Sequence, residues 1–290
     1  MIQEVKGLAI ITISRGSYSH GQEIAEKVAG LLGYKCISRE ILVEAAQLFN
    51  VSEKKLIRSL NDAPNILERM VHGKERYLEY IKAPLLEYAR KGNVVYHGHA
   101  GHLLLTEVPN VLKVRLLAEK DDRIALLQQR QNISREQALA IIESEDKNRV
   151  NWTRYLYKMD LNDPWLYDIV IKIGGLNIED ACAIICRAAR SESYQSTDES
   201  KQAIDDLAIT NRVQAELKSI CDAQVSVRNG EVQIKVAAQK RRKSGYISPA
   251  LQHHIGESYQ HDLTRQIHEI VHNVPGVKDV FCQVDMPYYT

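Results

Sequence analysis

The sequence lacks any run of apolar residues long enough to cross a membrane, for which about 18 to 20 are needed. The apolar stretch nearest the N-terminus, residues 8–13, is also too short for the core of a signal peptide. An excess of either charge is missing as well, because 38 Lys and Arg residues face 37 Asp and Glu residues. We therefore expect a cytoplasmic protein with no strong signal for nucleic acid as a partner.

Cysteine is scarce, and its spacing matches no disulfide-rich class. The chain has five cysteines, an odd number with no CxxC pair, which argues against a disulfide framework. They are Cys36, Cys182, Cys186, Cys221 and Cys282. Cys182 and Cys186 lie one helical turn apart in an apolar pattern, and we interpret them as small buried apolar residues.

The residues that are present are typical of a soluble globular protein, with 44% apolar and 26% charged residues. A length of 290 residues suffices for two domains of roughly 100–200 residues each. The composition turns polar and serine-rich between residues 192 and 202, which predicts a linker. We therefore expect one domain over residues 1–191 and a second over residues 203–290.

In the first domain, short apolar segments rich in β-branched residues alternate with helical patterns. Strands are expected at residues 8–14, 34–37, 93–97, 111–117 and 167–173. Helices are expected at residues 23–32, 39–49, 52–60, 74–91, 120–131, 135–148 and 178–191. Continuous apolar strands that alternate with helices are typical of a parallel sheet buried on both faces. The first domain is therefore predicted to be an α/β domain.

The second domain shows a different order of elements, helix-strand-strand-helix-strand, and is predicted to be a small α+β domain. Its first helix is expected over residues 202–221 and its second over residues 261–273. Between them an alternating pattern surrounds Asn229-Gly230, the strongest short signal for a β-hairpin turn. The last strand is expected over residues 277–284.

A glycine-containing loop joins the first expected strand to the first expected helix, with the sequence Gly16-Ser-Tyr-Ser-His-Gly21. The spacing of its glycines matches the GxxxxG of a phosphate-binding loop. Backbone N–H groups in such a loop, together with the positive helix end, form a cradle for anions. The Lys and the Ser or Thr that should follow are replaced by Gln22 and Glu23. An ordinary strand-to-helix turn is the alternative interpretation.

Several separated segments resemble the cytidylate-kinase-like family, in the same order, from about residue 8 to residue 190. They are Ile11-Thr-Ile-Ser-Arg15, Gly21-Gln-Glu-Ile-Ala25, Leu32-Gly-Tyr-Lys-Cys-Ile-Ser-Arg-Glu-Ile-Leu42, Asn93-Val-Val-Tyr-His-Gly98, Asp146-Lys-Asn-Arg149 and Tyr167-Asp-Ile-Val-Ile171. The resemblance implies a P-loop NTPase-type sheet of five parallel strands with helices on both faces. It also implies a nucleoside monophosphate kinase that uses ATP and Mg²⁺ to phosphorylate an acceptor such as CMP.

The same resemblance implies roles for individual residues. The donor phosphates would be held by Gly16, Ser17, Tyr18, Ser19, His20, Gly21, Gln22 and Glu23. The acceptor would be bound by Ser38, Arg39, His97 and His99. Charge on the transferred group would be neutralised by Arg123, Arg130 and Arg149, with Asp146 as a further lid residue. Asp146 is expected to pair with Arg149, which lies one helical turn further along the chain.

Two departures from the family pattern indicate weakened catalysis. Gln22 stands where the family has Lys or Arg, and an amide cannot neutralise a phosphate. His97 and His99 occupy a segment where such kinases often carry an arginine. A protonated His20 would replace the missing cation only in part. These departures leave two hypotheses: an ATP-dependent phosphotransferase, or a catalytically degenerate nucleotide-binding regulatory protein.

Three further motifs have competing interpretations. His268-Glu-Ile-Val-His272 matches the HExxH of zinc proteases, but no Glu follows that would serve as a third ligand. His97-Gly-His-Ala-Gly-His102 offers three metal ligands, although contact with a phosphate or acceptor better fits its place after a buried strand. Lys240-Arg-Arg-Lys243 is a basic patch for phosphates of RNA, DNA or lipid, with a solvated loop as the alternative.

The second domain resembles the BON domain family over residues 204–285. The resemblance rests on the order of its elements, the hairpin at Asn229-Gly230 and the segment Val274-Pro-Gly-Val-Lys-Asp-Val280 before the last strand. It implies a binding or regulatory module whose partner is a phospholipid or a protein, while the first domain binds nucleotides.

Overall fold

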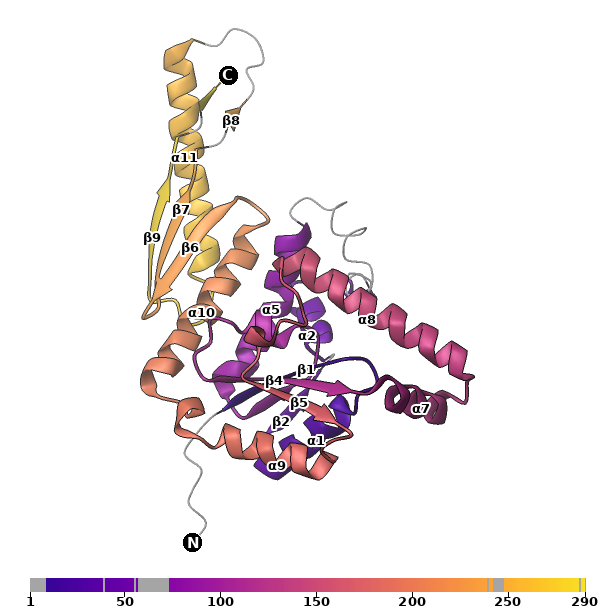
Figure 1. The fold of residues 1–290 in the computed structure, drawn as a ribbon. Coiled ribbons are helices and arrows are strands. Elements are labelled where there is room, and N and C mark those ends of the chain that lie inside the picture. The colour runs from indigo at the N-terminus through magenta and orange to yellow at the C-terminus, as the bar shows by residue number, and fades with distance from the viewer. Residues whose placement is uncertain are drawn as a thin grey trace. The chain divides into compact units, whose positions relative to one another are not determined.

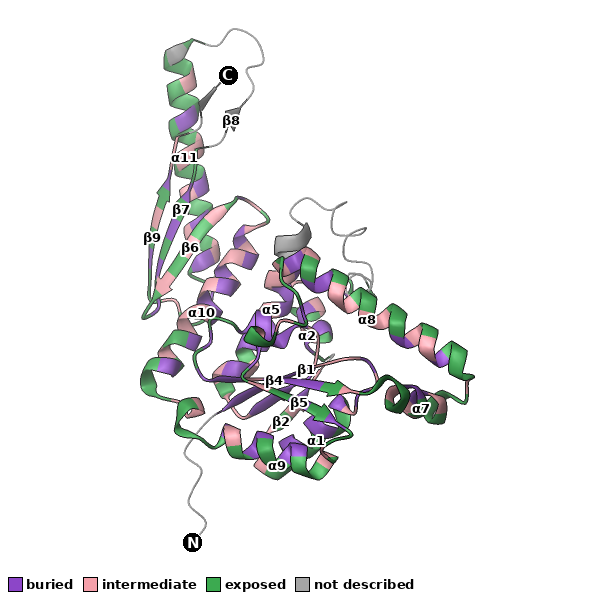
Figure 2. Ribbon diagram, viewed as in Figure 1, coloured by how far each residue is buried: buried purple, intermediate pink, exposed green. Residues whose placement is uncertain are grey.

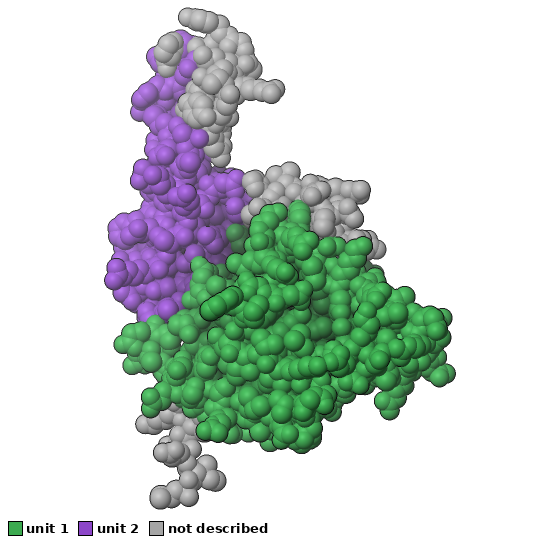
Figure 3. All heavy atoms as spheres, viewed as in Figure 1, with its two compact units in different colours: residues 1–201 green, residues 202–290 purple. Residues whose placement is uncertain are grey.

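The computed structural model describes residues 9–38, 40–54, 56, 73–238, 240–241, 248–286 and 288–289. The chain divides into two compact units, unit 1 over residues 1–201 and unit 2 over residues 202–290 (Figure 3). Each unit has a hydrophobic core of its own. Within the described residues, no helix is both long and apolar enough to cross a membrane.

Unit 1 is built on one sheet of five parallel strands in the order β2-β3-β1-β4-β5. The strands are β1 (Ile10–Arg15), β2 (Lys35–Ile37), β3 (Val94–Tyr96), β4 (Val111–Ala118) and β5 (Ile169–Ile173). In the central strand, Ile11 pairs with Val95 of β3 and with Leu112 of β4. The expected α/β domain with five parallel strands is thus confirmed.

Helices flank this sheet on both faces (Figure 1). They are α1 (Gly21–Leu32), α2 (Glu40–Leu48), α5 (Gly73–Lys91), α6 (Gly101–Leu104), α7 (Lys120–Gln131), α8 (Arg135–Tyr157) and α9 (Ile178–Ala189). α1 and α9 pack together on one face, and Ile24 and Ile185 bury their side chains there against Leu112. α2 and α5 pack together on the other face. The β-branched residues of β1 fill the space between, and Figure 2 shows that strand as buried.

α7 and α8 form a helical hairpin that follows β4 and is held by Ile124, Leu127, Ala138 and Ile142. α8 begins at residue 135, as the sequence predicts, and Ser134 caps it, because its side chain and that of Gln137 each accept a hydrogen bond from the other's backbone N–H. α8 continues beyond its expected end at residue 148, since the buried residues Trp152 and Leu156 extend its apolar face.

The helix expected over residues 52–60 lies mostly outside the described residues. Residues 53, 54 and 56 are helical. The serine-rich segment after α9 is more ordered than a simple linker, since it holds a short 3-10 turn at Glu192–Tyr194 and the start of α10 (Asp198–Leu217). Thr197 and Ser200 exchange backbone-to-side-chain hydrogen bonds at that start. The polar composition of this segment therefore supplies a helix cap.

Unit 2 has the expected order of elements, α10, β6 (Ala223–Arg228), β7 (Glu231–Val236), α11 (Pro249–Val271) and β9 (Asp279–Val284). β7 lies between β6, to which it is antiparallel, and β9, to which it is parallel. Two short strands, β8 (Lys240–Arg241) and β10 (Tyr288–Tyr289), also pair. The predicted hairpin turn is confirmed, because Asn229 and Gly230 both have positive φ, and Asp206 of α10 accepts hydrogen bonds from both their N–H groups.

Candidate functional site

The loop of residues 16–20 lies where the sequence places it, between the end of β1 and the first turn of α1. Tyr18 and His20 both adopt left-handed conformations, with φ of 57° and 58°. The hydroxyl of Ser19 donates a hydrogen bond to the carbonyl of Gly16 at 2.8 Å and closes the loop on itself. Left-handed residues within a turn bring successive N–H groups toward one point, which creates a concave site for an anion.

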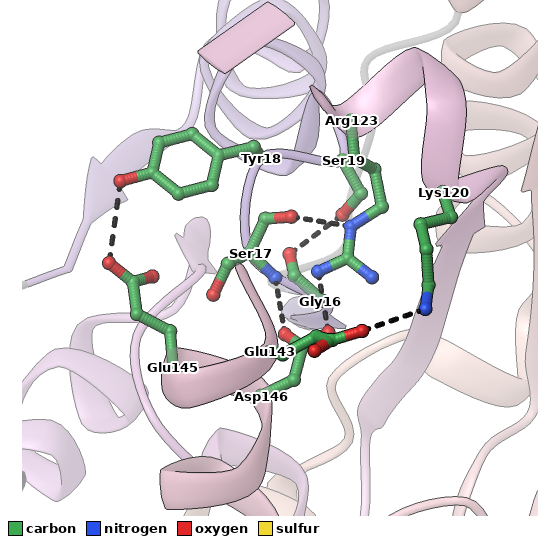
Figure 4. Close-up of polar contacts among 9 residues, drawn as sticks. All are labelled: Gly16, Ser17, Tyr18, Ser19, Lys120, Arg123, Glu143, Glu145 and Asp146. Atoms are coloured by element: carbon green, nitrogen blue, oxygen red, sulfur yellow. Dashed lines mark hydrogen bonds and ion pairs between the residues drawn. The ribbon is translucent and has the colours of Figure 1, made fainter. Parts of the chain in front are cut away.

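A carboxylate binds a backbone N–H of this loop. The N–H of Ser17 donates to Asp146 Oδ1 at 3.0 Å, and Asp146 Oδ2 lies 2.6 Å from Arg123 Nη2 (Figure 4). Arg123 Nε also donates to the Ser17 carbonyl at 2.7 Å, so the guanidinium bridges the loop and the carboxylate. The expected pairing of Asp146 with Arg149 is therefore wrong. Asp146 turns toward α7 because Arg123 supplies both a charge and a hydrogen-bond donor there.

α8 is held over the loop by a second contact, in which the Tyr18 hydroxyl donates to Glu145 Oε1 at 3.3 Å. Glu145 and Asp146 are adjacent on α8, and each contacts an adjacent residue of the loop (Figure 4). The helical hairpin of α7 and α8 thus lies against the loop in the manner of a lid.

Two cavities adjoin the loop, and each has several arginines in its lining. The first has a volume of about 170 Å³ and is lined by Arg15, Ser17, Tyr18, Ser19, His20, Gly21, Gln22, Leu126, Arg130, Glu145 and Arg149. The second, of about 270 Å³, is lined by four arginines, Arg15, Arg115, Arg123 and Arg149, with Asp146 as its carboxylate. Burial lowers the pKa of the Arg115 and Arg149 guanidinium groups, and nearby carboxylates partly offset this for Arg149. All three predicted lid arginines line the cavities beside the loop: Arg130 lines the first, Arg123 the second and Arg149 both.

A third cavity, of about 160 Å³, brings together the predicted acceptor residues Ser38, His97 and His99. Its apolar wall comes from Ile41, Leu42, Ile81, Tyr96 and Trp152, and its polar wall includes Arg15, Asn148 and Arg149. The ring of His99 lies edge-on to Trp152 at 5.3 Å. Arg39, which was predicted to contact the acceptor, lies outside the described residues.

The three histidines that follow β3 do not form one cluster: His97 and His99 line the third cavity, whereas His102 does not. His97 lines the third cavity, and burial together with the charge of Arg15 lowers its pKa to about 4. His102 instead packs against the ring of Tyr167 at 4.7 Å, and burial lowers its pKa to about 3. Within the described residues, no three His, Cys, Asp or Glu side chains form a cluster that could hold a metal ion.

Gln22 and His20 line the first cavity, but their side chains bond to carboxylates of α1. The Gln22 amide donates to Glu26 at 2.8 Å along the exposed side of α1. His20 Nδ1 lies 2.9 Å from Glu23 Oε2, so this imidazole and the predicted Glu23 satisfy each other. An open cavity of about 790 Å³ lies beyond His20 and is lined by α7 and by the segment of residues 173–180 that joins β5 to α9.

Two motifs of unit 2 form no site among the residues that the structure describes. The rings of His268 and His272 in the HExxH segment lie 5.8 Å apart, and the described part of the chain places no third ligand beside them, as a catalytic zinc would need. Lys240 and Arg241 of the basic patch form β8, and the rest of that patch falls outside the described residues.

The sequence prediction missed Arg15 and Arg115. Arg15 ends β1 and belongs to the segment Ile11-Thr-Ile-Ser-Arg15, so its position in a matching motif was the available signal. Arg115 interrupts the apolar strand β4, and its Nη1 donates to the Ser14 hydroxyl at 2.9 Å behind the loop. A buried charge in the middle of a strand is unusual enough to indicate a functional or structural role.

The similarity of this chain to known proteins is found in unit 1. Residues 10–174 match the model of the cytidylate kinase-like family. A cytidylate kinase from Ignicoccus hospitalis is 29% identical over 170 residues, which cover 57% of this chain and 89% of that protein. A cytidylate kinase from Methanothrix thermoacetophila is 27% identical over 184 residues, or 63% of this chain and 98% of that one. A solved structure of an uncharacterized protein from Eubacterium ventriosum is 24% identical and covers 62% of this chain and 97% of its own, with a TM-score of 0.49.

Proposed function

Because this chain belongs to the cytidylate kinase-like family, we propose that it transfers the γ-phosphoryl group of ATP to a nucleoside monophosphate, with CMP as the first candidate. The observation that carries this proposal is the contact between the Ser17 N–H and the Asp146 carboxylate, flanked by Arg123. It indicates that the loop binds an oxyanion through its backbone, as a donor phosphate requires. The name of the two relatives, cytidylate kinase, supports CMP as acceptor.

The arrangement of the cavities supports transfer between two bound nucleotides. The polyphosphate would lie on the loop, among the arginines of the first two cavities. The acceptor would enter the third cavity, where Trp152 and Ile81 offer apolar surface for a base and Ser38, His99 and Asn148 offer hydrogen bonds. Arg149 lines all three cavities and would contact the phosphates of both substrates. The open cavity beyond His20 would receive the base of ATP.

The residues fit a polyphosphate better than they fit a cation held by protein alone. Four arginines and one carboxylate line the cavity beside Gly16, which favours an anion. Mg²⁺ would therefore arrive on the ATP phosphates, where it neutralises charge and orients the γ-phosphoryl group. Asp146, the carboxylate of that cavity, is already held by the Ser17 N–H and by Arg123.

Catalysis in this site would depend on positioning and charge. Phosphoryl transfer needs the attacking and leaving oxygens in line and the charge on the transferred group neutralised. Arg123, Arg130 and Arg149 come from the α7 and α8 hairpin, so closure of that hairpin would exclude water and complete the set of charges. His97 would remain a neutral hydrogen-bonding group near pH 7, since its pKa is about 4.

A second candidate function is a catalytically degenerate nucleotide-binding regulator. The exposed Gln22 amide, which bonds to Glu26 and not to the loop, is the observation that favours it. In that case unit 2 would bind a phospholipid or protein partner, as its predicted BON-like character implies. The two candidates differ in turnover and share the binding of ATP.

The experiment that tests the proposal is a coupled ADP-release assay with ATP, Mg²⁺ and each of AMP, CMP, GMP and UMP, with calorimetric titration of ATP in parallel. The proposal predicts ATP binding and ADP release that depends on a monophosphate. ATP binding without turnover would leave the regulatory candidate in place. Absence of ATP binding would contradict both candidates.

A further inference from the structure

Arg15 is the last residue of β1, and its side chain crosses the first turn of α1. A Cβ atom placed on Gly21 would lie 1.7 Å from Arg15 Cδ and 2.7 Å from Arg15 Nε. Gly21 has a helical backbone and no positive φ, so the glycine is needed at this position for space. The second glycine of the GxxxxG pattern thus leaves room for an arginine side chain to lie over the helix N-terminus.

The position of Arg15 lies between the donor and acceptor parts of the site. Arg15 lines the cavity at the loop, the arginine-lined cavity beside Gly16 and the cavity of the predicted acceptor residues. Arg149 also lines all three. The charge of Arg15 also reaches His97 on the acceptor side, where it helps to hold that imidazole neutral.

Gln22 occupies the position of the usual loop lysine but does not perform its role. Its amide bonds to Glu26 on the exposed side of α1. Arg15 comes from the opposite end of the loop, from the strand and not the helix, and reaches over Gly21. A guanidinium also offers a planar fork of donors that two phosphate oxygens can share, which a lysine ammonium does not.

We propose that Arg15 is a catalytic residue that supplies the loop cation which Gln22 does not supply. This inference rests on the proposed function. In the transfer step an oxygen of the acceptor phosphate bonds to the γ-phosphorus of ATP, the bond from that phosphorus to the β–γ bridging oxygen breaks, and the bridging oxygen leaves with the electron pair on ADP. Arg15 stays protonated throughout and stabilises the charge on the equatorial oxygens of the transferred group.

The test compares Arg15→Met and Arg15→Lys with Arg187→Met, a matched control that removes an exposed arginine of α9 away from the cavities. We expect kcat to fall about 10²- to 10³-fold in Arg15→Met, with Tm close to that of the wild type, and to fall less in Arg15→Lys, which keeps the charge. Arg187→Met should match the wild type. In the double variant Arg15→Met/Gln22→Lys, a lysine at the usual position should restore part of kcat, a gain that a merely structural role for Arg15 would not produce.

The outcomes separate this inference from the proposed function. If the wild type neither binds ATP nor releases ADP, the proposed function fails before Arg15 is tested. If the wild type is active and Arg15→Met keeps kcat within about threefold, the role of Arg15 is overturned. It is also overturned if both Arg15 variants lose activity only in proportion to a loss of folded protein measured by circular dichroism, or if Gln22→Lys restores nothing in folded Arg15→Met.

Discussion

The Asp146 carboxylate lies 3.0 Å from the backbone nitrogen of Ser17 and thereby occupies an N–H group that a donor phosphate would use. Its second oxygen pairs with Arg123, the residue whose charge would otherwise face that phosphate. Under the proposed function, this side chain of the lid and the phosphates of ATP would compete for the same two partners. The affinity for ATP would then depend on whether Asp146 leaves the Ser17 N–H when the nucleotide binds.

Asp146→Asn should bind ATP more tightly than the wild type, by about 3- to 10-fold in Kd, because an amide competes less well for the Ser17 N–H and frees the charge of Arg123. The same change should lower the free energy of unfolding by about 1–3 kcal/mol, since a charge-assisted bond is lost. Calorimetric titration and urea unfolding measure the two effects. Glu143→Gln, which removes an exposed pair with Lys120, is the control and should change neither. Weaker ATP binding in Asp146→Asn would show that the carboxylate serves the nucleotide or its Mg²⁺.

Gln22→Lys alone should change kcat by less than about threefold. Arg15 already supplies a positive charge at the loop, and Gln22 is directed toward Glu26. Steady-state ADP release measures this effect, with Gln22→Met as a control that removes the amide without adding charge. A gain of about 100-fold in Gln22→Lys would instead identify the wild type as a kinase damaged at this position.

Gly21→Ala should lower kcat to a degree similar to Arg15→Met, because its new Cβ would displace the Arg15 side chain. Gly30→Ala is a control on the same helix, where an added Cβ meets no atom within 4 Å. It should leave kcat unchanged and raise the free energy of unfolding by about 0.5–1 kcal/mol, as expected for Ala in a helix interior. ADP release and thermal unfolding are the measurements. Full activity in Gly21→Ala would argue that the position of Arg15 over α1 is unimportant.

Unit 1 should lose stability as the pH falls from about 6.5 to 4. The pKa of His97 is lowered to about 4 and that of His102 to about 3, so both imidazoles are neutral in the folded chain while the unfolded chain binds protons near pH 6.5. The stabilisation is fully present above pH 6.5 and is lost as the pH falls through the folded pKa values.

Urea unfolding at pH 7.5, 6 and 5 measures this effect, and both tryptophans, Trp152 and Trp165, report on unit 1 by fluorescence. His97→Gln and His102→Gln should each flatten the pH dependence, by up to roughly 2 kcal/mol between pH 7.5 and pH 5. His254→Gln, an exposed histidine of α11, should not. Identical pH profiles for all four proteins would contradict the lowered pKa values.

The sequence predicts the local features of this fold well, because each depends on neighbouring residues. Ser134 begins α8 through Gln137, three residues away, and Asn229-Gly230 forms the hairpin turn through their own positive φ values. The loop at Gly16 is located by its glycines and by the apolar strand before it. Local sequence patterns predict these elements, because their hydrogen bonds join residues only a few positions apart.

The features that the sequence did not predict depend on contacts between distant segments. Asp146 is three residues from Arg149 and 23 from Arg123, yet it pairs with Arg123 because α7 folds back beside α8. From the sequence, Arg15 is only the polar residue at the end of a strand. Its side chain lies over Gly21 because α1 packs against the sheet. Spacing along α8 therefore predicted Arg149 as the partner of Asp146, whereas the packing of α7 against α8 brings Arg123 to that carboxylate.

³¹P NMR of a mixture of ATP, Mg²⁺, CMP and the protein is the most direct test of phosphoryl transfer, because the products of transfer and of hydrolysis give separate signals. We expect ADP and CDP to appear in equal amounts, inorganic phosphate to stay at background, and Arg15→Met to slow the formation of both products by about 10²- to 10³-fold. No reaction with CMP, AMP, GMP or UMP, or ADP that appears with inorganic phosphate and no second diphosphate, would contradict it.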